Sequence, residues 1–251
     1  MRNFGKAKKY FTKALDAKET AVGIGKKHSS YAKTCNAVGT VWYESGNYDK
    51  ALKFYYQSLE TSEKVHGEDH IITASIYDDL GATYYRKEKY GKALKYCKKA
   101  LRIYEISFGK DHRFTATSYK NMGAVYHRRS DLAKNQSSAK DAGSVASKSN
   151  AGPSKHSDTS GADLQQALKY YYRALTSYML VYGRGHSCTA ECYKHIGAIY
   201  AKTDYKKALK YYNDAFEIHK LVYGEDHIET QNTSKVYEEC KERNRRQRRI
   251  R

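Results

Sequence analysis

Proline is almost missing from this chain of 251 residues, which contains a single one at Pro153. Average usage of roughly 5% would give about a dozen prolines in a chain of this length. The scarcity excludes proline-rich and collagen-like proteins, and it leaves almost nothing in the sequence to interrupt helices.

Long apolar runs and paired cysteines are missing too. No stretch approaches the roughly 18 apolar residues of a membrane span, and the basic segment Met1–Tyr10 lacks the apolar core of a signal peptide. We therefore expect no membrane insertion. The cysteines are odd in number and form no CxxC pair, which predicts reduced thiols in a cytoplasmic or nuclear compartment. They are Cys35, Cys97, Cys188, Cys192 and Cys240.

Positive charge and tyrosine are abundant. The 46 Lys and Arg residues outnumber 27 Asp and Glu residues, which gives a formal net charge of +19, and the chain has 26 tyrosines. Hydrophobic residues make up 40%, too many for a wholly disordered chain. The charge is compatible with a nucleic acid, an acidic protein partner or simply solvated lysines.

A repeat of 42 residues runs through the sequence. The string Gly-x-x-His recurs with its histidines 42, 42, 74 and 41 residues apart, so one repeat carries an insertion of 32 residues. Two further markers keep the same register: an apolar-Gly-x-x-aromatic string, such as Leu80-Gly81…Tyr84, and an Ala-Leu pair, such as Ala93-Leu94. The histidines of the first marker are His28, His70, His112, His186 and His227.

Each repeat is typical of two helices. In the second repeat, the pattern predicts helices over Ile72–Arg86 and Tyr90–Phe108, because large residues recur at helical spacing on one face. Gly81 lies within that face and allows a neighbouring helix to approach closely. At the following turn, Gly109 suits a helix C-cap, Asp111 can supply an N-cap oxygen, and His112 is placed to close the turn.

The spacing Tyr77-x2-Leu80-Gly81-x2-Tyr84…Ala93-x3-Cys97-x2-Ala100 resembles the tetratricopeptide repeat. The period and the Gly-x-Asp-His ending are similar to the subclass of kinesin light chains and nephrocystin-like proteins. The resemblance implies an all-α, right-handed superhelical solenoid of about ten helices. One departure is consistent, because the residue after each histidine is not the proline usual in the family. Those residues are Ser29, Ile71, Arg113, Ser187 and Ile228.

The register divides the chain into five parts. We expect a half repeat, consisting of a second helix only, over 1–28, and then two repeats and the first helix of a third over 29–130. The insertion follows over 131–162. The second helix of the third repeat, a fourth repeat and a capping helix fill 163–240, and an arginine-rich tail covers 241–251. The half repeat, with its helix over Phe4–Val22, is explained either by a truncated gene model or by an array that once extended further.

The insertion, about Asp131 to Ala162, is rich in Ser, Ala, Gly and Lys and has no aromatic residue. Such a composition buries too little surface to offset the entropy of ordering, so we expect a flexible loop. It is explained either by tolerance of insertions at an exposed turn or by regulatory phosphorylation of its serines.

The resemblance also implies a function. The first helices of tetratricopeptide arrays line a concave groove that takes extended or helical peptides, so we expect a non-catalytic adaptor or scaffold for a protein partner. Asn36 and Asn121 match the amides with which kinesin-light-chain-like repeats bind a peptide backbone. The side chains expected to point into the groove are Lys33, Asn36, Tyr43, Asp78, Asp79, Arg86, Lys120, Asn121, His127, Arg128, Lys194, His195 and Lys202.

Charge on the groove predicts the kind of peptide. The third and fourth repeats present basic side chains and, by this reasoning, only Glu191 as an acid, which favours a peptide with an acidic stretch. The alternative function uses the tail for nuclear import or nucleic-acid binding, against the simpler interpretation of a solvated tail. Its arginines are Arg243, Arg245, Arg246, Arg248, Arg249 and Arg251.

Chemistry-bearing motifs point away from an enzyme. The sequence has no phosphate-binding Walker loop, nucleophile elbow or HExxH string, and the repeated histidines have a structural place in the turns. Cys188, Cys192 and His195 stand at i, i+4 and i+7, a spacing compatible with zinc. Because Cys188 aligns with apolar packing positions of other repeats, we predict neither a metal nor a cofactor.

Overall fold

The structure is a computed structural model that describes residues 13, 17, 28–143 and 156–250. Across these ranges, nine α-helices alternate with short turns and no strand is present. The helix predicted over Phe4–Val22 lies outside the described residues. No helix in the described ranges combines the length and the apolar character that crossing a membrane would require.

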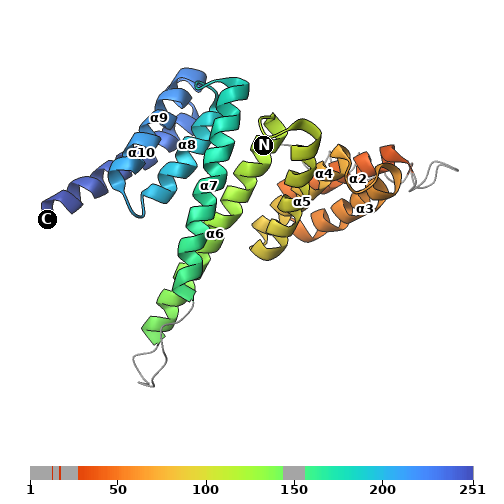
Figure 1. Cartoon of the computed structure of the whole chain (residues 1–251), viewed down its shortest axis with the longest axis horizontal. Coiled ribbons are helices and arrows are strands. Elements are labelled where there is room, and N and C mark those ends of the chain that lie inside the picture. The colour runs from red at the N-terminus through yellow and green to blue at the C-terminus, as the bar shows by residue number, and fades with distance from the viewer. Residues whose placement is uncertain (1–12, 14–16, 18–27, 144–155, 251) are drawn as a thin grey trace. The chain divides into compact units, whose positions relative to one another are not determined.

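The chain divides into two compact units, Met1–Gly109 and Lys110–Arg251. In the first unit, α2 (Ser29–Glu44) packs against α3 (Tyr48–His66), and α4 (Ile71–Arg86) packs against α5 (Tyr90–Phe108) (Figure 1). The helices predicted for the second repeat agree with α4 and α5 to within one residue.

The second unit continues the same architecture. The pair α6 (Arg113–Gly143) and α7 (His156–Tyr182) is followed by α8 (Ser187–Tyr200) and α9 (Tyr205–Tyr223), and α10 (Ile228–Ile250) packs against α9 (Figure 1). The predicted all-α stack of helix pairs is confirmed.

A glycine within each of the first helices α2, α4, α6 and α8 brings the paired helices together. A Cβ atom placed on Gly81 would lie 2.6 Å from the Cys97 sulfur, and one on Gly39 would lie 2.7 Å from the Tyr55 ring. Such distances are too short for a side chain, so the close approach predicted from the repeat is present. The corresponding contacts in the second unit are Gly123 with Tyr171 and Gly197 with Tyr212.

The repeated histidines cap the first helices. The Nδ1 atom of His70 accepts the backbone N–H of Ile72 at 3.2 Å, and the equivalent bonds of the other four repeats measure 3.1 to 3.3 Å. The N-cap predicted for Asp111 is therefore wrong: the extended backbone just before the helix places the next residue, His112, within reach of the free N–H. The glycine three residues before the histidine adopts a positive φ, +92° at Gly67.

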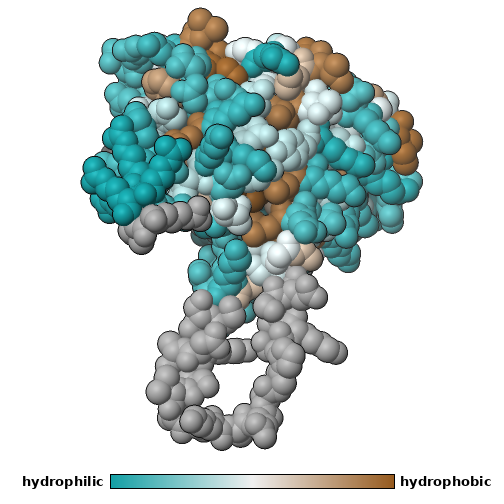
Figure 2. Space-filling view, turned by 60° about the vertical axis from the view of Figure 1, so that its left-hand side comes forward, coloured by the Kyte–Doolittle hydropathy of each residue, from teal (hydrophilic) through white to brown (hydrophobic). Residues whose placement is uncertain are grey.

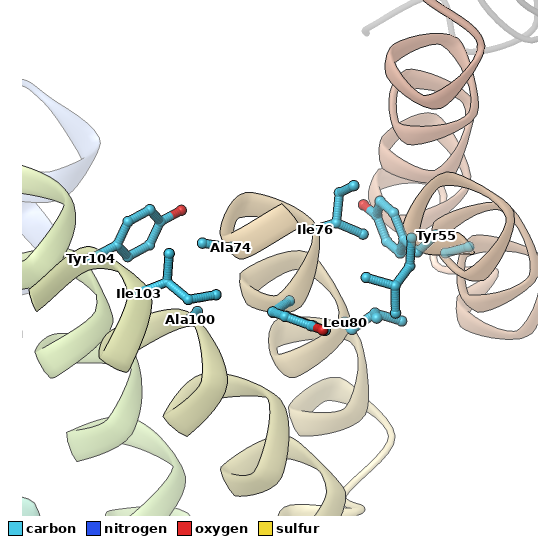
Figure 3. Packing of buried hydrophobic residues seen from close by; sticks show 10 residues of the cluster. Tyr55, Ala74, Ile76, Leu80, Ala100, Ile103 and Tyr104 are labelled. Atoms are coloured by element: carbon cyan, nitrogen blue, oxygen red, sulfur yellow. The ribbon is translucent and has the colours of Figure 1, made fainter. Parts of the chain in front are cut away.

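Small and large apolar side chains alternate in the core of the first unit. Ala74, Ile76 and Leu80 of α4 face Tyr55 of α3 on one side and Ala100, Ile103 and Tyr104 of α5 on the other (Figure 3). All of these residues are buried. The first helix of the repeat is therefore sandwiched between second helices, and its remaining face is left for the groove.

Tyrosine hydroxyls join neighbouring repeats within each unit. The Tyr56 hydroxyl lies 2.8 Å from that of Tyr84 and 2.9 Å from that of Tyr96, so that side chains of α3, α4 and α5 meet. The second unit repeats this cluster, with the Tyr172 hydroxyl 3.2 Å from that of Tyr200 and 2.8 Å from that of Tyr211. Many of the abundant tyrosines thus serve packing, as the register predicts.

The flexible loop predicted over 131–162 is wrong at both of its ends, because α6 continues to Gly143 and α7 begins at His156. Buried Ser130 donates to the Ser160 carbonyl at 2.9 Å, and Arg129 donates to the Asp163 carboxylate at 2.7 Å. Two helices that already pack can lengthen at little cost through Ala, Ser and Lys, and each covers the other. Residues 144–155 lie outside the described ones.

The tail also differs from its prediction, because residues 241–250 continue α10. Arg, Gln, Glu and Lys are good helix formers, and an established helix adds residues without a new nucleation step. Arg246 and Glu242 form an ion pair of 3.5 Å, one turn apart on this extension.

Candidate functional site: the faces of the first helices

Two predicted groove residues of the first unit influence each other. Burial raises the pKa of Asp79 on α4 to about 6, and the nearby Asn36 side chain on α2, the first helix of the preceding repeat, offsets this only in part. Within the described residues, no lysine or arginine forms an ion pair with this carboxylate.

Asn36 is itself incompletely satisfied. Its Oδ1 atom is buried and has no hydrogen-bond partner among the described residues. The neighbouring Asp78 is placed differently, since its carboxylate interacts with the Tyr104 hydroxyl of α5. Asp78 therefore has a hydrogen-bonding partner on α5. Among the described residues, Asp79 has no cationic partner.

The remaining predicted residues of the first unit are occupied by other contacts. Arg86 donates through Nε to the Tyr48 hydroxyl at 3.0 Å, and the Tyr48 ring lies 5.7 Å from that of Tyr43. Lys33 is exposed and lies close enough to His66 to lower the pKa of that histidine, which burial also lowers. Neither Arg86 nor Lys33 forms an ion pair with Asp79 among the described residues.

In the second unit, the predicted basic residues meet acids. Lys194 on α8 lies 2.7 Å from Glu191 and 3.3 Å from Glu229 of α10. Although burial alone would lower the pKa of Lys194, the two carboxylates raise it. Lys120 on α6 is close enough to Glu191 to help lower the pKa of that acid. Asn121, next to Lys120, is half-buried on α6.

Two histidines line the same surface in the neutral form. Burial lowers the pKa of His195 to about 4, although Glu191 opposes the shift, and nearby Lys120 and Lys194 add to it. The His195 ring stacks on Tyr171 with 5.0 Å between ring centroids. Burial and Lys202 likewise lower the pKa of His127 to about 4. Its Nε2 atom therefore accepts a hydrogen bond from Lys202 at 2.8 Å.

Asp131 and Glu229 complete this surface, and sequence reasoning missed both. Asp131 forms an ion pair with Lys202, yet it had been assigned to the insertion. It stands one helical turn after His127, which is the signal that could have found it. Glu229 occupies a register position that is serine, isoleucine, phenylalanine or cysteine in the other repeats, so the register gives no signal for an acid there. The prediction that Glu191 is the only acid here is wrong, because α6 extends further and α10 contributes a carboxylate.

Arg128 stands apart from these pairs. It is exposed on α6, and no ion pair to it occurs in the described part of the chain. The surface of the second unit is therefore a mixed one, with Lys194 and Lys202 neutralised by neighbouring acids and Arg128 still available.

The arginines of the tail lie on α10. Arg243, Arg245, Arg246, Arg248 and Arg249 are exposed, whereas Arg251 is outside the described residues. Arg248 helps to line a hollow of about 330 Å³ against residues 203–206, which form the end of the turn after α8 and the start of α9. A role in nuclear import or nucleic-acid binding stays a prediction.

The three candidate zinc ligands do not assemble. No group of three or more His, Cys, Asp or Glu side chains suited to a metal occurs among the residues that the structure describes. Burial raises the pKa of Cys192 to about 12, so this thiol keeps its proton, and the His195 ring stacks on Tyr171. Both side chains belong to the packing around α8.

Apolar side chains gather at one end of the helices in the second unit. Leu180, Leu221 and Ile228 are 67%, 81% and 61% exposed, near the ends of α7 and α9 and the start of α10. Figure 2 shows brown, hydrophobic side chains at the top, near the centre and at the right edge of one face, among largely hydrophilic ones. Leu180, Leu221 and Ile228 are not among the predicted groove residues.

Comparisons with known proteins agree with the fold. The model of the tetratricopeptide repeat family matches residues 30–106, 79–134 and 162–221. No protein of curated function matches the sequence. Among solved structures, BtubC (BKLC) from P. vanneervenii is 15% identical with a TM-score of 0.65, and covers 100% of this chain and 92% of its own.

A Podosopora anserina protein with nearly identical TPR-like repeats of the kinesin light chain type is 10% identical with a TM-score of 0.63, covering 87% of each chain. MamA is 15% identical with a TM-score of 0.51, covering 87% of this chain and 90% of its own. At such identities the structures show a shared fold alone. The match of the family model, which spans more than half of the chain, shows that this chain belongs to the tetratricopeptide repeat family.

Proposed function

We propose that the chain is a non-catalytic adaptor that binds a peptide segment of another protein on the faces of its first helices. Tetratricopeptide repeat proteins generally act as scaffolds for protein partners. The observation that carries the proposal is the surface of the second unit, where polar side chains from the successive first helices α6, α8 and α10 meet. A surface of this kind offers both donors and acceptors to an extended chain.

Arg128 gives the peptide a chemical character. Because its guanidinium is exposed and unpaired within the described residues, it can form a charge-assisted bond with a carboxylate of the peptide. Lys120 and Lys202 add positive potential nearby, although Lys202 is already paired with Asp131. We therefore propose a segment that brings at least one acidic side chain to the second unit.

A random peptide display library tests this function without knowledge of the partner. The wild-type chain and two charge reversals, Arg128→Glu and Lys169→Glu, are used as bait. Lys169 is an exposed lysine on the second helix α7, and it serves as a matched control for net charge. We expect the wild type and Lys169→Glu to enrich peptides with Asp or Glu, and Arg128→Glu to bind those peptides about tenfold more weakly.

Two results would contradict the proposal. Absence of any selected peptide on the wild type would show that the helix faces do not bind peptides. Selection of the same peptides with the same affinity by Arg128→Glu would show that Arg128 does not contact the ligand. Circular dichroism of both variants confirms that their helices are intact.

A further inference from the structure

We propose that the last turns of α10 bind the phosphate backbone of double-stranded DNA without regard to its base sequence. The inference concerns the second unit alone, and it stands or falls independently of the peptide adaptor proposed above. It assigns a ligand to residues 241–250, which peptide binding on the first helices leaves unexplained.

Positive charge is concentrated on this part of α10. Between Arg243 and Arg249 the helix carries five arginines and no acidic residue, and all five side chains are exposed. Because an α-helix rises about 1.5 Å per residue, these charges are spread over roughly 9 Å of its axis. Duplex DNA carries one negative charge per about 1.7 Å of its own axis, so the two charge densities match closely.

The acids of α10 leave most of these arginines available. Glu238 pairs with Lys241 at 3.0 Å, and Glu242 pairs with Arg246 at 3.5 Å. Three other arginines form no ion pair within the ranges that the structure describes: Arg245, Arg248 and Arg249. Guanidinium groups in this state can bind phosphate oxygens through two parallel hydrogen bonds.

Packing turns part of this basic surface outward. Thr233 and Cys240 are buried on α10, and Asn244 is half-buried one turn after Cys240. Residues at this spacing share one face of a helix, so Arg245 and Arg249, one turn apart, point away from that face. Figure 1 shows the dark-blue end of α10 reaching past the turn between α8 and α9. A long polyanion can therefore lie along these turns without meeting α8 or α9.

The neighbouring turn continues the basic surface. Lys206, at the start of α9, lines the hollow of about 330 Å³ together with Arg248. Asp204 also lines it, but its carboxylate accepts two backbone N–H groups in the first turn of α9, each at 3.1 Å, and so caps that helix. The amides of Asn244 and Gln247 complete the lining and can donate hydrogen bonds to a phosphate.

The composition of these turns favours duplex DNA over other polyanions. Residues 241–249 contain no aromatic side chain, on which the bases of a single strand would stack, and no apolar side chain for insertion into a membrane. The major groove of B-form DNA admits an α-helix, whereas the major groove of an RNA duplex is deep and narrow.

Fluorescence anisotropy of the full chain with a short labelled DNA duplex of random sequence, measured over a range of KCl concentrations, tests the proposal. Arg245→Gln combined with Arg249→Gln removes two charges and keeps good helix formers. Lys95→Gln combined with Lys98→Gln is the matched control, because both lysines are exposed on one helix, α5. We expect the wild type and the control to bind alike. The slope of log affinity against log salt should be shallower by about 1.8 for the arginine variant, and its affinity roughly tenfold lower.

A second variant separates charge from folding. Arg245→Lys combined with Arg249→Lys keeps both charges and should bind the duplex within about threefold of the wild type. The proposal is overturned if the wild type does not bind the duplex, if the glutamine variant of the arginines binds like the wild type, or if the lysine control or the lysine-substituted arginine variant loses as much affinity as that glutamine variant.

Competition identifies the class of ligand. Unlabelled DNA duplex should displace the labelled one better than the single strand of the same sequence, an RNA duplex or polyglutamate. Stronger competition by the single strand or the RNA duplex would overturn the assignment to duplex DNA. Equal competition by polyglutamate would show that these turns of α10 take an acidic polypeptide instead.

Discussion

At the scale of single residues, Asp79 should destabilise the protein. Its pKa of about 6 in the folded chain stands above the ordinary value of 3.8, so the folded state holds the proton more tightly than the unfolded state does. Stability is therefore lost as the pH rises between these two values, and the full cost is present above about pH 6.

Asp79→Asn should consequently be more stable than the wild type at neutral pH. We expect the free energy of unfolding of the variant to exceed that of the wild type by about 1–3 kcal/mol near pH 7. The difference should shrink toward zero near pH 4, where the wild-type carboxyl is protonated. Urea unfolding of both proteins at the two pH values measures this.

The control for that prediction is Asp49→Asn, because Asp49 is exposed on the same unit. Its effect should stay within about 0.5 kcal/mol at either pH. A wild type that is more stable than Asp79→Asn at neutral pH would mean that the carboxylate has a stabilising partner within the chain.

Residue-scale geometry also shows where the sequence stops being informative. The register placed Asn36 and Asp79 on the predicted groove, because each lies just before the glycine of its first helix. It did not show that Asn36 influences the pKa of Asp79, nor that Asp78 interacts with Tyr104, because adjacent residues of one helix point about 100° apart and the partner helix decides which is buried.

At the scale of elements, helix pairs follow from periodicity and helix ends follow from context. α4 and α5 were predicted to within one residue, since a polar turn and a Gly-x-x-His string mark their ends. The extensions of α6, α7 and α10 were not predicted, because no capping or apolar signal marks them. They depend on a helix that is already formed and on a neighbour, which composition alone does not show.

The revised boundaries of the insertion lead to a deletion experiment. Removing residues 138–157 and joining the ends with a short glycine linker should leave stability nearly unchanged. Removing residues 131–162, the segment that the sequence suggested, also takes away Ser160 and Asp131. Ser160 is the hydrogen-bond partner of buried Ser130, and Asp131 forms the ion pair with Lys202. We expect that longer deletion to cost about 2–4 kcal/mol.

Thermal and urea unfolding compare the two deletions. Adding Ser130→Ala to the longer deletion is an internal control, because it removes the hydroxyl that would otherwise be left buried without a partner, and it should recover part of the loss. Equal stability of the two deletion variants would mean that residues 131–137 of α6 and 158–162 of α7 contribute nothing to the stability of the fold.

At the scale of the whole molecule, the chain consists of two compact units, and the same kind of tyrosine cluster connects the helices within each unit. The tyrosine cluster of Tyr56, Tyr84 and Tyr96 lies wholly in the first unit, and that of Tyr172, Tyr200 and Tyr211 lies wholly in the second. In a repeat protein, stability is approximately a sum of repeat and nearest-neighbour terms. A substitution in one tyrosine cluster should therefore lower the stability of its own unit only.

Tyr56→Phe and Tyr172→Phe make a reciprocal pair for testing this. Each removes one hydroxyl that bonds two others, and each should cost about 0.5–1.5 kcal/mol. In amide hydrogen exchange, Tyr56→Phe should speed exchange in α3, α4 and α5 and leave α7, α8 and α9 unchanged, whereas Tyr172→Phe should do the reverse. If either variant speeds exchange equally in both units, the chain opens as a single cooperative body, and the prediction that each change stays within its own unit is wrong.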